Sequence, residues 1–112
     1  MITAAGRRIS KQLGQLLRQL LRYQPQRVYV FGSYAREEHD SLSDIDLVIV
    51  KETDKPFFER MREVLSYVEH KGPIDLLVYT PSEFEHMKEV HNAFIELLLE
   101  EGLCIYDAEK AA

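Results

Sequence analysis

Three short apolar segments place the tightest limit on the fold of this chain. Val28–Phe31, Asp44–Val50 and Ile74–Tyr79 each have the length and the residue types of a largely buried strand. Leu103–Tyr106 could add a last short strand. The polar stretch Arg36–Ser43 is long enough to connect the first two strands but too polar for a buried crossover helix. These segments therefore predict a small mixed β-sheet.

Helical patterns precede, separate and follow these strands. The first helix has apolar residues at the spacing of one helical face: Ile9, Leu13, Leu16, Leu17, Leu20 and Leu21. Pro25 should follow the first helix, and Thr53 or Asp54 should precede the second helix, which should have Pro56 in its first turn and Gly72-Pro73 after its end. The capping-box pattern Thr80-Pro81-Ser82-Glu83 should precede the third helix. This third helix should break near Asn92 and end at Gly102. The order of elements predicts the α+β class, with helices flanking the sheet.

The composition is that of an ordinary globular domain. The chain has 112 residues, of which 46% are hydrophobic and 29% charged, and we expect one domain spanning residues 1–112. Its longest aliphatic stretch, Leu47–Val50, is far shorter than the ~20 residues of a membrane-spanning helix. The N-terminus lacks the apolar segment of a secretory signal, and the lone Cys104 can form no internal disulfide. These features favour a cytoplasmic protein that does not contact a membrane.

The charges are distributed unevenly along the chain. Residues 1–36 hold seven Lys or Arg and no Asp or Glu, whereas residues 37–112 hold seven against nineteen, for a net charge of −5. Such a basic block can mark a nucleic-acid surface or a docking site for an acidic partner, but it is more often a solvated helix face. Without aromatic residues interleaved among the basic ones, nucleic-acid binding is possible but not favoured.

Three acidic residues interrupt otherwise apolar strands. Asp44 and Asp46 are two residues apart, so both carboxylates should lie on one face of a strand with Cα atoms ~6.7 Å apart. Asp75 is a single acid in the third strand, and strand pairing could bring it beside them. A lone acid here would more often cap a loop, but three together suit a Mg²⁺ or Mn²⁺ site for phosphoryl or nucleotidyl transfer.

A glycine-serine pair, Gly32-Ser33, precedes these acids in the sequence. Gly32-Ser33 ends the first strand, where a backbone without a side chain can approach a phosphate, although such a pair alone is merely a turn. The run from Gly32 to Arg36, followed by Ser43 to Leu47, resembles the signature of the DNA polymerase β superfamily of nucleotidyltransferases. The length narrows the resemblance to the minimal nucleotidyltransferases (MNT). Relatives commonly have glycine where this chain has Glu37.

The resemblance implies a role for each motif residue. Gly32 and Ser33 would hold the nucleotide phosphates, and Asp44 and Asp46 would bind two Mg²⁺ ions. Asp75 would complete the metal site near the attacking hydroxyl and is the candidate general base. A further residue, Arg36, could contact a phosphate, with a salt bridge as the equal alternative.

The same resemblance implies a reaction and a partner. We expect Mg²⁺-dependent transfer of AMP from ATP to a hydroxyl, often a tyrosine of a HEPN-domain toxin, with this chain as the antitoxin of a hetero-oligomer. A free-standing transferase acting on a small molecule or a nucleic-acid end, and a non-catalytic binding antitoxin, are the alternatives. Because the motifs and their supporting helices use nearly all of the chain, a partner should present the acceptor. The basic first helix, or Phe94, Ile95 and Leu98, would dock it.

Overall fold

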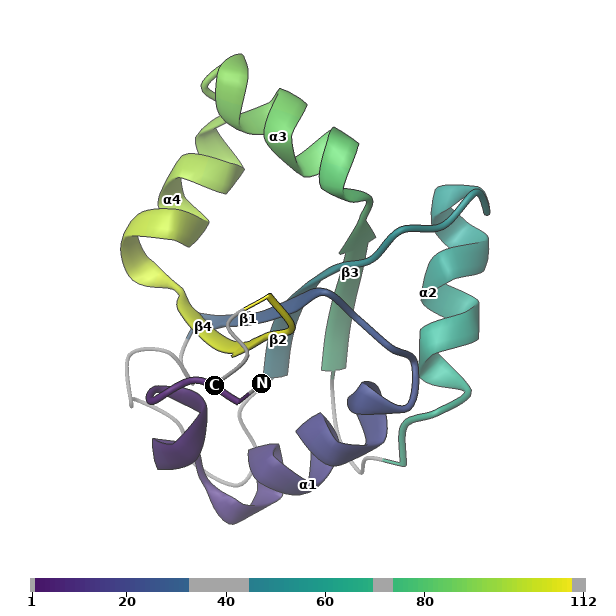
Figure 1. The fold of residues 1–112 in the computed structure, drawn as a ribbon, viewed down its shortest axis with the longest axis vertical. Helices are drawn as coiled ribbons and strands as arrows, with labels where there is room; N and C mark the ends of the chain where they lie inside the picture. The colour runs from purple at the N-terminus through teal and green to yellow at the C-terminus, as the bar shows by residue number, and fades with distance from the viewer. Residues whose placement is uncertain (1, 33–44, 70–73, 110–112) are drawn as a thin grey trace.

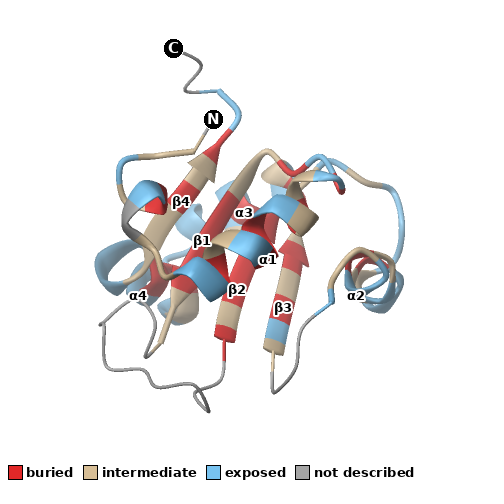
Figure 2. Ribbon diagram, turned by 90° about the horizontal axis from the view of Figure 1, so that it is seen from below, coloured by how far each residue is buried: buried red, intermediate tan, exposed pale blue. Residues whose placement is uncertain are grey.

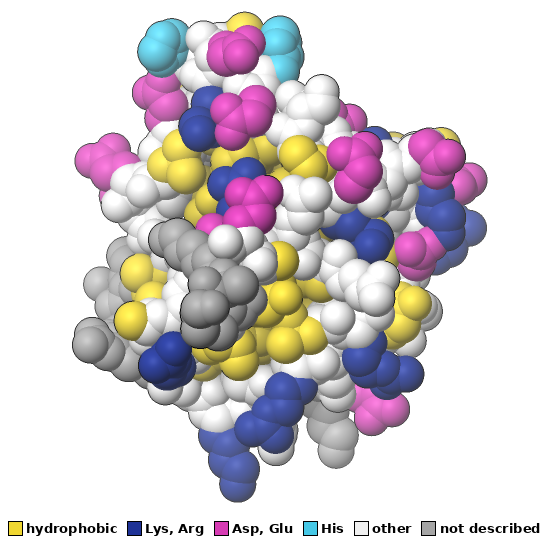
Figure 3. Space-filling model, in the orientation of Figure 1, with side chains coloured by type: hydrophobic (Ala, Val, Ile, Leu, Met, Phe, Trp, Pro, Cys, Tyr) yellow, Lys and Arg dark blue, Asp and Glu magenta, His cyan; other side chains and the backbone are white. Residues whose placement is uncertain are grey.

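The computed structural model describes residues 2–32, 45–69 and 74–109. On the face shown in Figure 3, the charged side chains at the α1 end of the molecule are mostly dark blue, whereas dark blue and magenta side chains are mixed around the other helices (Figures 1 and 3). In chain order the elements are η1 (Gly6–Arg8), α1 (Lys11–Leu21), β1 (Arg27–Phe31), β2 (Ile45–Val50), α2 (Phe57–Leu65), β3 (Ile74–Tyr79), α3 (Pro81–Glu89), α4 (Ala93–Glu101) and β4 (Leu103–Asp107).

The four strands form one mixed sheet in the order β3-β2-β1-β4. β1 pairs antiparallel with both β2 and β4, whereas β2 and β3 are parallel. A parallel pair needs a crossover connection, and α2 supplies it beside β3 at the edge of the sheet (Figure 2). The predicted α+β class with a small mixed sheet and flanking helices is therefore confirmed.

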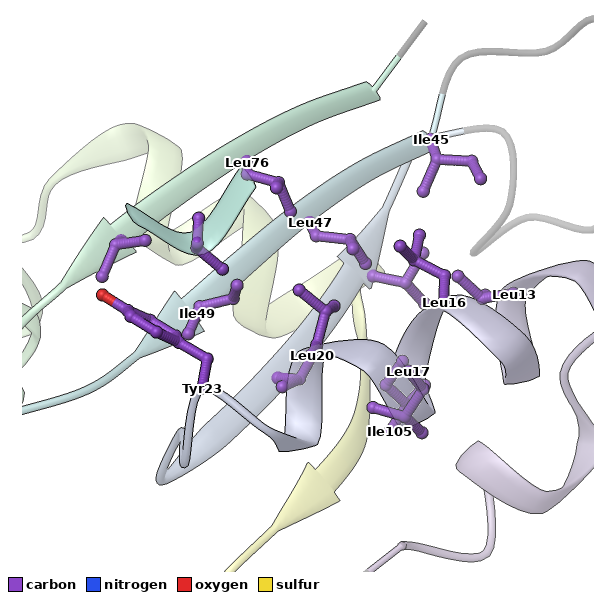
Figure 4. Packing of buried hydrophobic residues seen from close by; sticks show 14 residues of the cluster. Leu13, Leu16, Leu17, Leu20, Tyr23, Ile45, Leu47, Ile49, Leu76 and Ile105 are labelled. Atoms are coloured by element: carbon purple, nitrogen blue, oxygen red, sulfur yellow. The ribbon is translucent and has the colours of Figure 1, made fainter. Parts of the chain in front are cut away.

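Each face of the sheet carries its own hydrophobic core. Alternate strand residues point to opposite faces, so one strand feeds both cores. The core under α1 is drawn in Figure 4 and includes Leu13, Leu16, Leu17, Leu20, Tyr23, Val28, Val30, Ile45, Leu47, Ile49, Val64, Leu76, Val78 and Ile105. The core under α3 and α4 consists of Tyr29, Val48, Val50, Phe84, Ile95 and Leu98. The sheet is thus the middle of three layers (Figure 1).

The first helix begins and ends through specific polar contacts. The Ser10 hydroxyl accepts a hydrogen bond from the backbone N–H of Leu13, which satisfies one of the free donors of the first turn. Beyond the last turn, the Lys51 ammonium donates to the Tyr23 carbonyl over 2.7 Å. Burial of this ammonium lowers the pKa of Lys51. Lys51, the first residue after β2, thereby holds the end of α1 in place.

The second and third helices are joined by one buried arginine. Arg60 of α2 is 7% exposed, and its guanidinium donates to both carboxylate oxygens of Glu83, over 2.7 and 3.2 Å. It also donates to the backbone carbonyls of Lys55 and Val78. Glu83 in turn completes the predicted capping box with Thr80, which is confirmed. One side chain therefore links α2, β3 and the start of α3.

The break near Asn92 is confirmed, and two other expectations are wrong. The Asn92 side chain caps α4, so the third helical region is two helices. Pro56 is the N-cap of α2 and does not lie in its first turn, because its extended backbone precedes the first helical residue. Ile95 and Leu98, expected to dock a partner, are 0% and 2% exposed because they pack against the sheet.

Among the helices of the described residues, none has both the length and the apolar character needed to span a membrane.

The Arg60–Glu83 pair should make stability depend on pH. Hydrogen bonds from Arg60 hold the pKa of Glu83 below its usual value, so this contribution is present above the unfolded pKa and is lost as the pH falls through the folded pKa. Arg60→Gln should lower the free energy of unfolding by about 2 kcal/mol at pH 7 and flatten its decline between about pH 5 and pH 3. Urea denaturation across this pH range would measure both effects.

The control is Arg62→Gln, an exposed arginine of the same helix. It should change the free energy of unfolding by less than about 0.5 kcal/mol. If Arg60→Gln and the wild type lose stability equally in acid, the pair does not contribute as described.

Candidate active site

Three of the residues singled out by the sequence lie at one end of the sheet. Gly32 follows the C-terminal end of β1, while Asp46 and Asp75 lie near the N-terminal ends of β2 and β3. These strand ends meet at the edge from which the chain continues into undescribed segments (Figure 2). Residues separated by more than forty positions in the sequence are therefore brought together by strand pairing alone.

Asp46 and Asp75 are direct partners in the β2–β3 register. Side chains of paired residues leave the sheet on the same face, and neighbouring strands lie about 4.8 Å apart. Asp46 is half-buried and Asp75 is exposed, so solvent and ligands can reach this pair. The expectation that pairing brings Asp75 beside an acid of the second strand is confirmed for Asp46. Two converging carboxylates are the hard oxygen donors that Mg²⁺ prefers, so this donor set fits such an ion.

The direction of the Asp46 side chain is set by its neighbours. Ile45 and Leu47 are both fully buried in the core under α1. Because strand side chains alternate, burying these two residues sends Asp46 to the opposite face. Leu76 does the same for Asp75, since it is 2% exposed in the same core. The hydrophobic core thus sets the face on which both carboxylates lie.

Gly32 is required by both its backbone and its surroundings. Its φ of +74° lies in the left-handed region, which glycine adopts without the strain of a side chain. A Cβ atom at this position would lie 2.7 Å from Oδ2 of Asp46, closer than real Cβ atoms approach an oxygen. The absence of a side chain therefore leaves the space in which the Asp46 carboxylate lies.

The remaining predicted site residues fall outside the described part of the chain. Ser33, Arg36 and Asp44 belong to residues 33–44, as does Glu37, the departure from the usual motif. Within residues 2–32, 45–69 and 74–109, no group of three or more His, Cys, Asp or Glu side chains is arranged to hold a metal ion. The roles given to Ser33, Arg36 and Asp44 therefore stay predictions.

The structure also places a small apolar pocket beside Gly32 that the sequence reasoning missed. Its volume is about 100 Å³. The pocket is lined by the end of β1 and by one side of α4: Phe31, Gly32, Phe94, Leu97, Leu98 and Glu101. The rings of Phe31 and Phe94 meet edge to face at 5.4 Å. The sequence offered one signal, an aromatic residue directly before the glycine of the motif, but not which helix would pack over it.

Two curated proteins and one family are similar to this chain in sequence. Residues 12–111 match the family described as "Polymerase beta, Nucleotidyltransferase". A protein of Methanocaldococcus jannaschii named "Putative protein adenylyltransferase MJ1379" is 30% identical over 83 residues, which are 73% of this chain and 77% of that protein. A second protein of this organism, "Putative protein adenylyltransferase MJ0604", is 28% identical over 96 residues, or 86% of this chain and 93% of that protein.

A solved structure shares the fold. It is the crystal structure of "a putative nucleotidyltransferase from Sulfolobus solfataricus", with a TM-score of 0.62 and 23% identity. The alignment covers 95% of this chain and 86% of that chain. The superfamily resemblance of the sequence is thus confirmed. Since the family match spans nearly the whole chain, the protein belongs to the polymerase beta family of nucleotidyltransferases.

Proposed function

We propose that this chain is a Mg²⁺-dependent nucleotidyltransferase that moves AMP from ATP to the hydroxyl of a protein, a tyrosine of a HEPN-domain toxin. The observation that carries the site is the pairing of Asp46 with Asp75 beside Gly32. The pair supplies one acidic metal ligand, Asp46, and one accessible carboxylate for a proton, Asp75, and Gly32 supplies a backbone that a phosphate can approach. The proposal treats residues 1–112 as one nucleotidyltransferase domain.

Each described site residue has a distinct task in the proposed reaction. The acceptor oxygen bonds to the α-phosphorus of ATP, the bond from this phosphorus to the bridging oxygen breaks, and pyrophosphate leaves. Asp75 receives the proton of the acceptor hydroxyl, a role that suits its exposed position. Asp46, together with Asp44, would hold the metal, and Gly32 and Ser33 would contact the phosphates. When bound, Mg²⁺ would neutralise charge that develops on the phosphate oxygens.

The acceptor and the partner rest on different support from the site. The names of the two Methanocaldococcus jannaschii relatives describe transfer of AMP to a protein. The resemblance to minimal nucleotidyltransferases adds the HEPN-domain toxin and its tyrosine. The chain also exposes large apolar side chains that a protein partner could cover, among them Phe58 at 79% and Val90 at 57%. A hetero-oligomer in which this chain is the antitoxin, with ATP as its substrate, and the partner is the toxin agrees with the relatives' names, the family resemblance and the exposed apolar side chains.

The first prediction concerns the two paired acids. Asp46→Asn should lower AMP transfer more than about 100-fold because it removes charge from the metal ligands. Asp75→Asn should lower the rate about 100-fold and change the Kd of ATP less than about threefold, since its proposed role is that of a base. Transfer assays with labelled ATP and calorimetric titrations would separate the two effects.

The control for these variants is Asp54→Asn, which changes an exposed aspartate before α2. It should transfer AMP at the wild-type rate. Circular dichroism should show that all three variants remain folded. Transfer by Asp46→Asn at the wild-type rate would contradict the metal assignment.

Gly32 provides a second prediction with a matched control. Gly32→Ala should lower the free energy of unfolding by about 1 kcal/mol or more and weaken ATP binding, because its Cβ would displace the Asp46 carboxylate. Gly14→Ala lies in α1 with open space around the new Cβ, and it should raise the free energy of unfolding by about 0.5–1 kcal/mol. Equal effects of the two substitutions on ATP binding would argue against the role of Gly32.

The partner is tested by reconstitution with the HEPN-domain protein encoded beside this chain, if its gene neighbour is one. Labelled ATP and Mg²⁺ should place the label on a partner tyrosine and suppress the partner's nuclease activity. Replacing the labelled tyrosine by phenylalanine should abolish the labelling. Efficient transfer by the isolated chain to a small molecule would favour a free-standing enzyme, and tight inhibition without label would favour a non-catalytic antitoxin.

A further inference from the structure

The apolar pocket beside Gly32 is too small for a whole nucleotide but large enough for one flat ring system. Its volume of about 100 Å³ corresponds to roughly three water molecules of ~30 Å³ each. Phe31 and Phe94 line it with rings that meet edge to face, and Leu97 and Leu98 add aliphatic surface. Such walls offer stacking contacts to a planar base. The pocket therefore has the size and the chemistry to receive one ring of a planar base.

The order of strands indicates which part of the reaction faces this pocket. Phe31 of β1 is the register partner of Asp46, so its side chain leaves the sheet on the same face as that carboxylate. Asp75 lies on β3, on the other side of Asp46. Asp75, the proposed general base for the acceptor hydroxyl, is thus separated from the apolar pocket by strand β2. An acceptor that approaches Asp75 leaves the pocket to the nucleotide.

The end of α4 lies against β1, so the helix forms one wall of the pocket. A Cβ atom on Gly102 would lie 2.5 Å from the Leu98 carbonyl oxygen and 3.2 Å from that of Val30, so the backbone of the helix end closely approaches the strand. Leu98 itself is 2% exposed in the core under α3 and α4. By contrast, Leu97 is 51% exposed and lies at the mouth of the pocket.

One polar group at this mouth can discriminate between bases. Glu101 is exposed and lines the pocket, and an ionised carboxylate accepts hydrogen bonds but donates none. Adenine presents an exocyclic amino group to such an acceptor, whereas uracil presents a carbonyl oxygen at the corresponding position.

Resting on the proposed function, we infer that the pocket formed by Phe31, Phe94, Leu97, Leu98 and Glu101 binds the adenine base of ATP and sets the preference of the enzyme for this nucleotide. The phosphates then extend from the pocket past Gly32 toward Asp46. The nucleobase is thus selected by α4, a helix that contributes no residue to the proposed reaction.

The test compares the Kd of ATP and of UTP by calorimetry in the presence of Mg²⁺. ATP and UTP share ribose and triphosphate, so the ratio of their Kd values reports the contribution of the nucleobase alone. The wild-type chain should bind ATP about tenfold more tightly than UTP. Leu97→Ala and Glu101→Ala should each lower this ratio to about threefold or less.

The same helix supplies matched controls. Leu99 is 45% exposed and Glu100 is exposed, and neither lines the pocket. Leu99→Ala and Glu100→Ala should therefore keep the wild-type ratio. Using a ratio also cancels the general effect of removing a negative charge near a triphosphate.

Two kinds of failure can be told apart. Equal Kd values for ATP and UTP in the wild type, or an unchanged ratio in both pocket variants, would overturn the adenine subsite. A pocket that instead holds the acceptor ring would leave the ratio unchanged and raise the KM for the acceptor in Leu97→Ala, which also overturns the inference. Asp46→Asn tests the proposed function separately, because it should weaken Mg²⁺-dependent binding of both nucleotides alike.

Discussion

The packing of α1 against alternate residues of β2 is the interaction on which the site depends. Four leucines of α1 are at most 2% exposed, and they share one core with Ile45, Leu47 and Ile49. Burying every second residue of β2 fixes the face to which Asp46 points. A shift of the strand by one residue would turn this carboxylate into the core under α1, at a cost of several kcal/mol. The hydrophobic effect therefore sets the direction of a charged group.

Much of this arrangement could be predicted from local patterns. The apolar strand segments, the capping box at Thr80 and the break near Asn92 each depend on residues close together in the chain, and all three are confirmed. The proximity of Asp46 and Asp75 was also predictable, because both interrupt apolar strands near their starts and only a parallel pairing was needed to join them.

Long-range contacts were beyond the reach of the same reasoning. Nothing near Arg60 in the sequence indicates that it would be buried and paired with Glu83, since an arginine between apolar helix positions is usually solvated. The burial of Ile95 and Leu98 likewise depends on which sheet face receives α4. The pocket beside Gly32 depends on β4 returning next to β1, which brings the end of α4 to the end of that strand.

The position of Leu98 links the selection of a ligand to the stability of the fold. This leucine belongs to the core under α3 and α4 and also lines the pocket, so most changes to it would cost stability before they altered the pocket. Leu97 and Glu101 line the same pocket from the exposed side of the helix. Relatives could therefore acquire different ligand preferences through these two surface positions while the core stays the same, which is a short route by which one small scaffold could diversify.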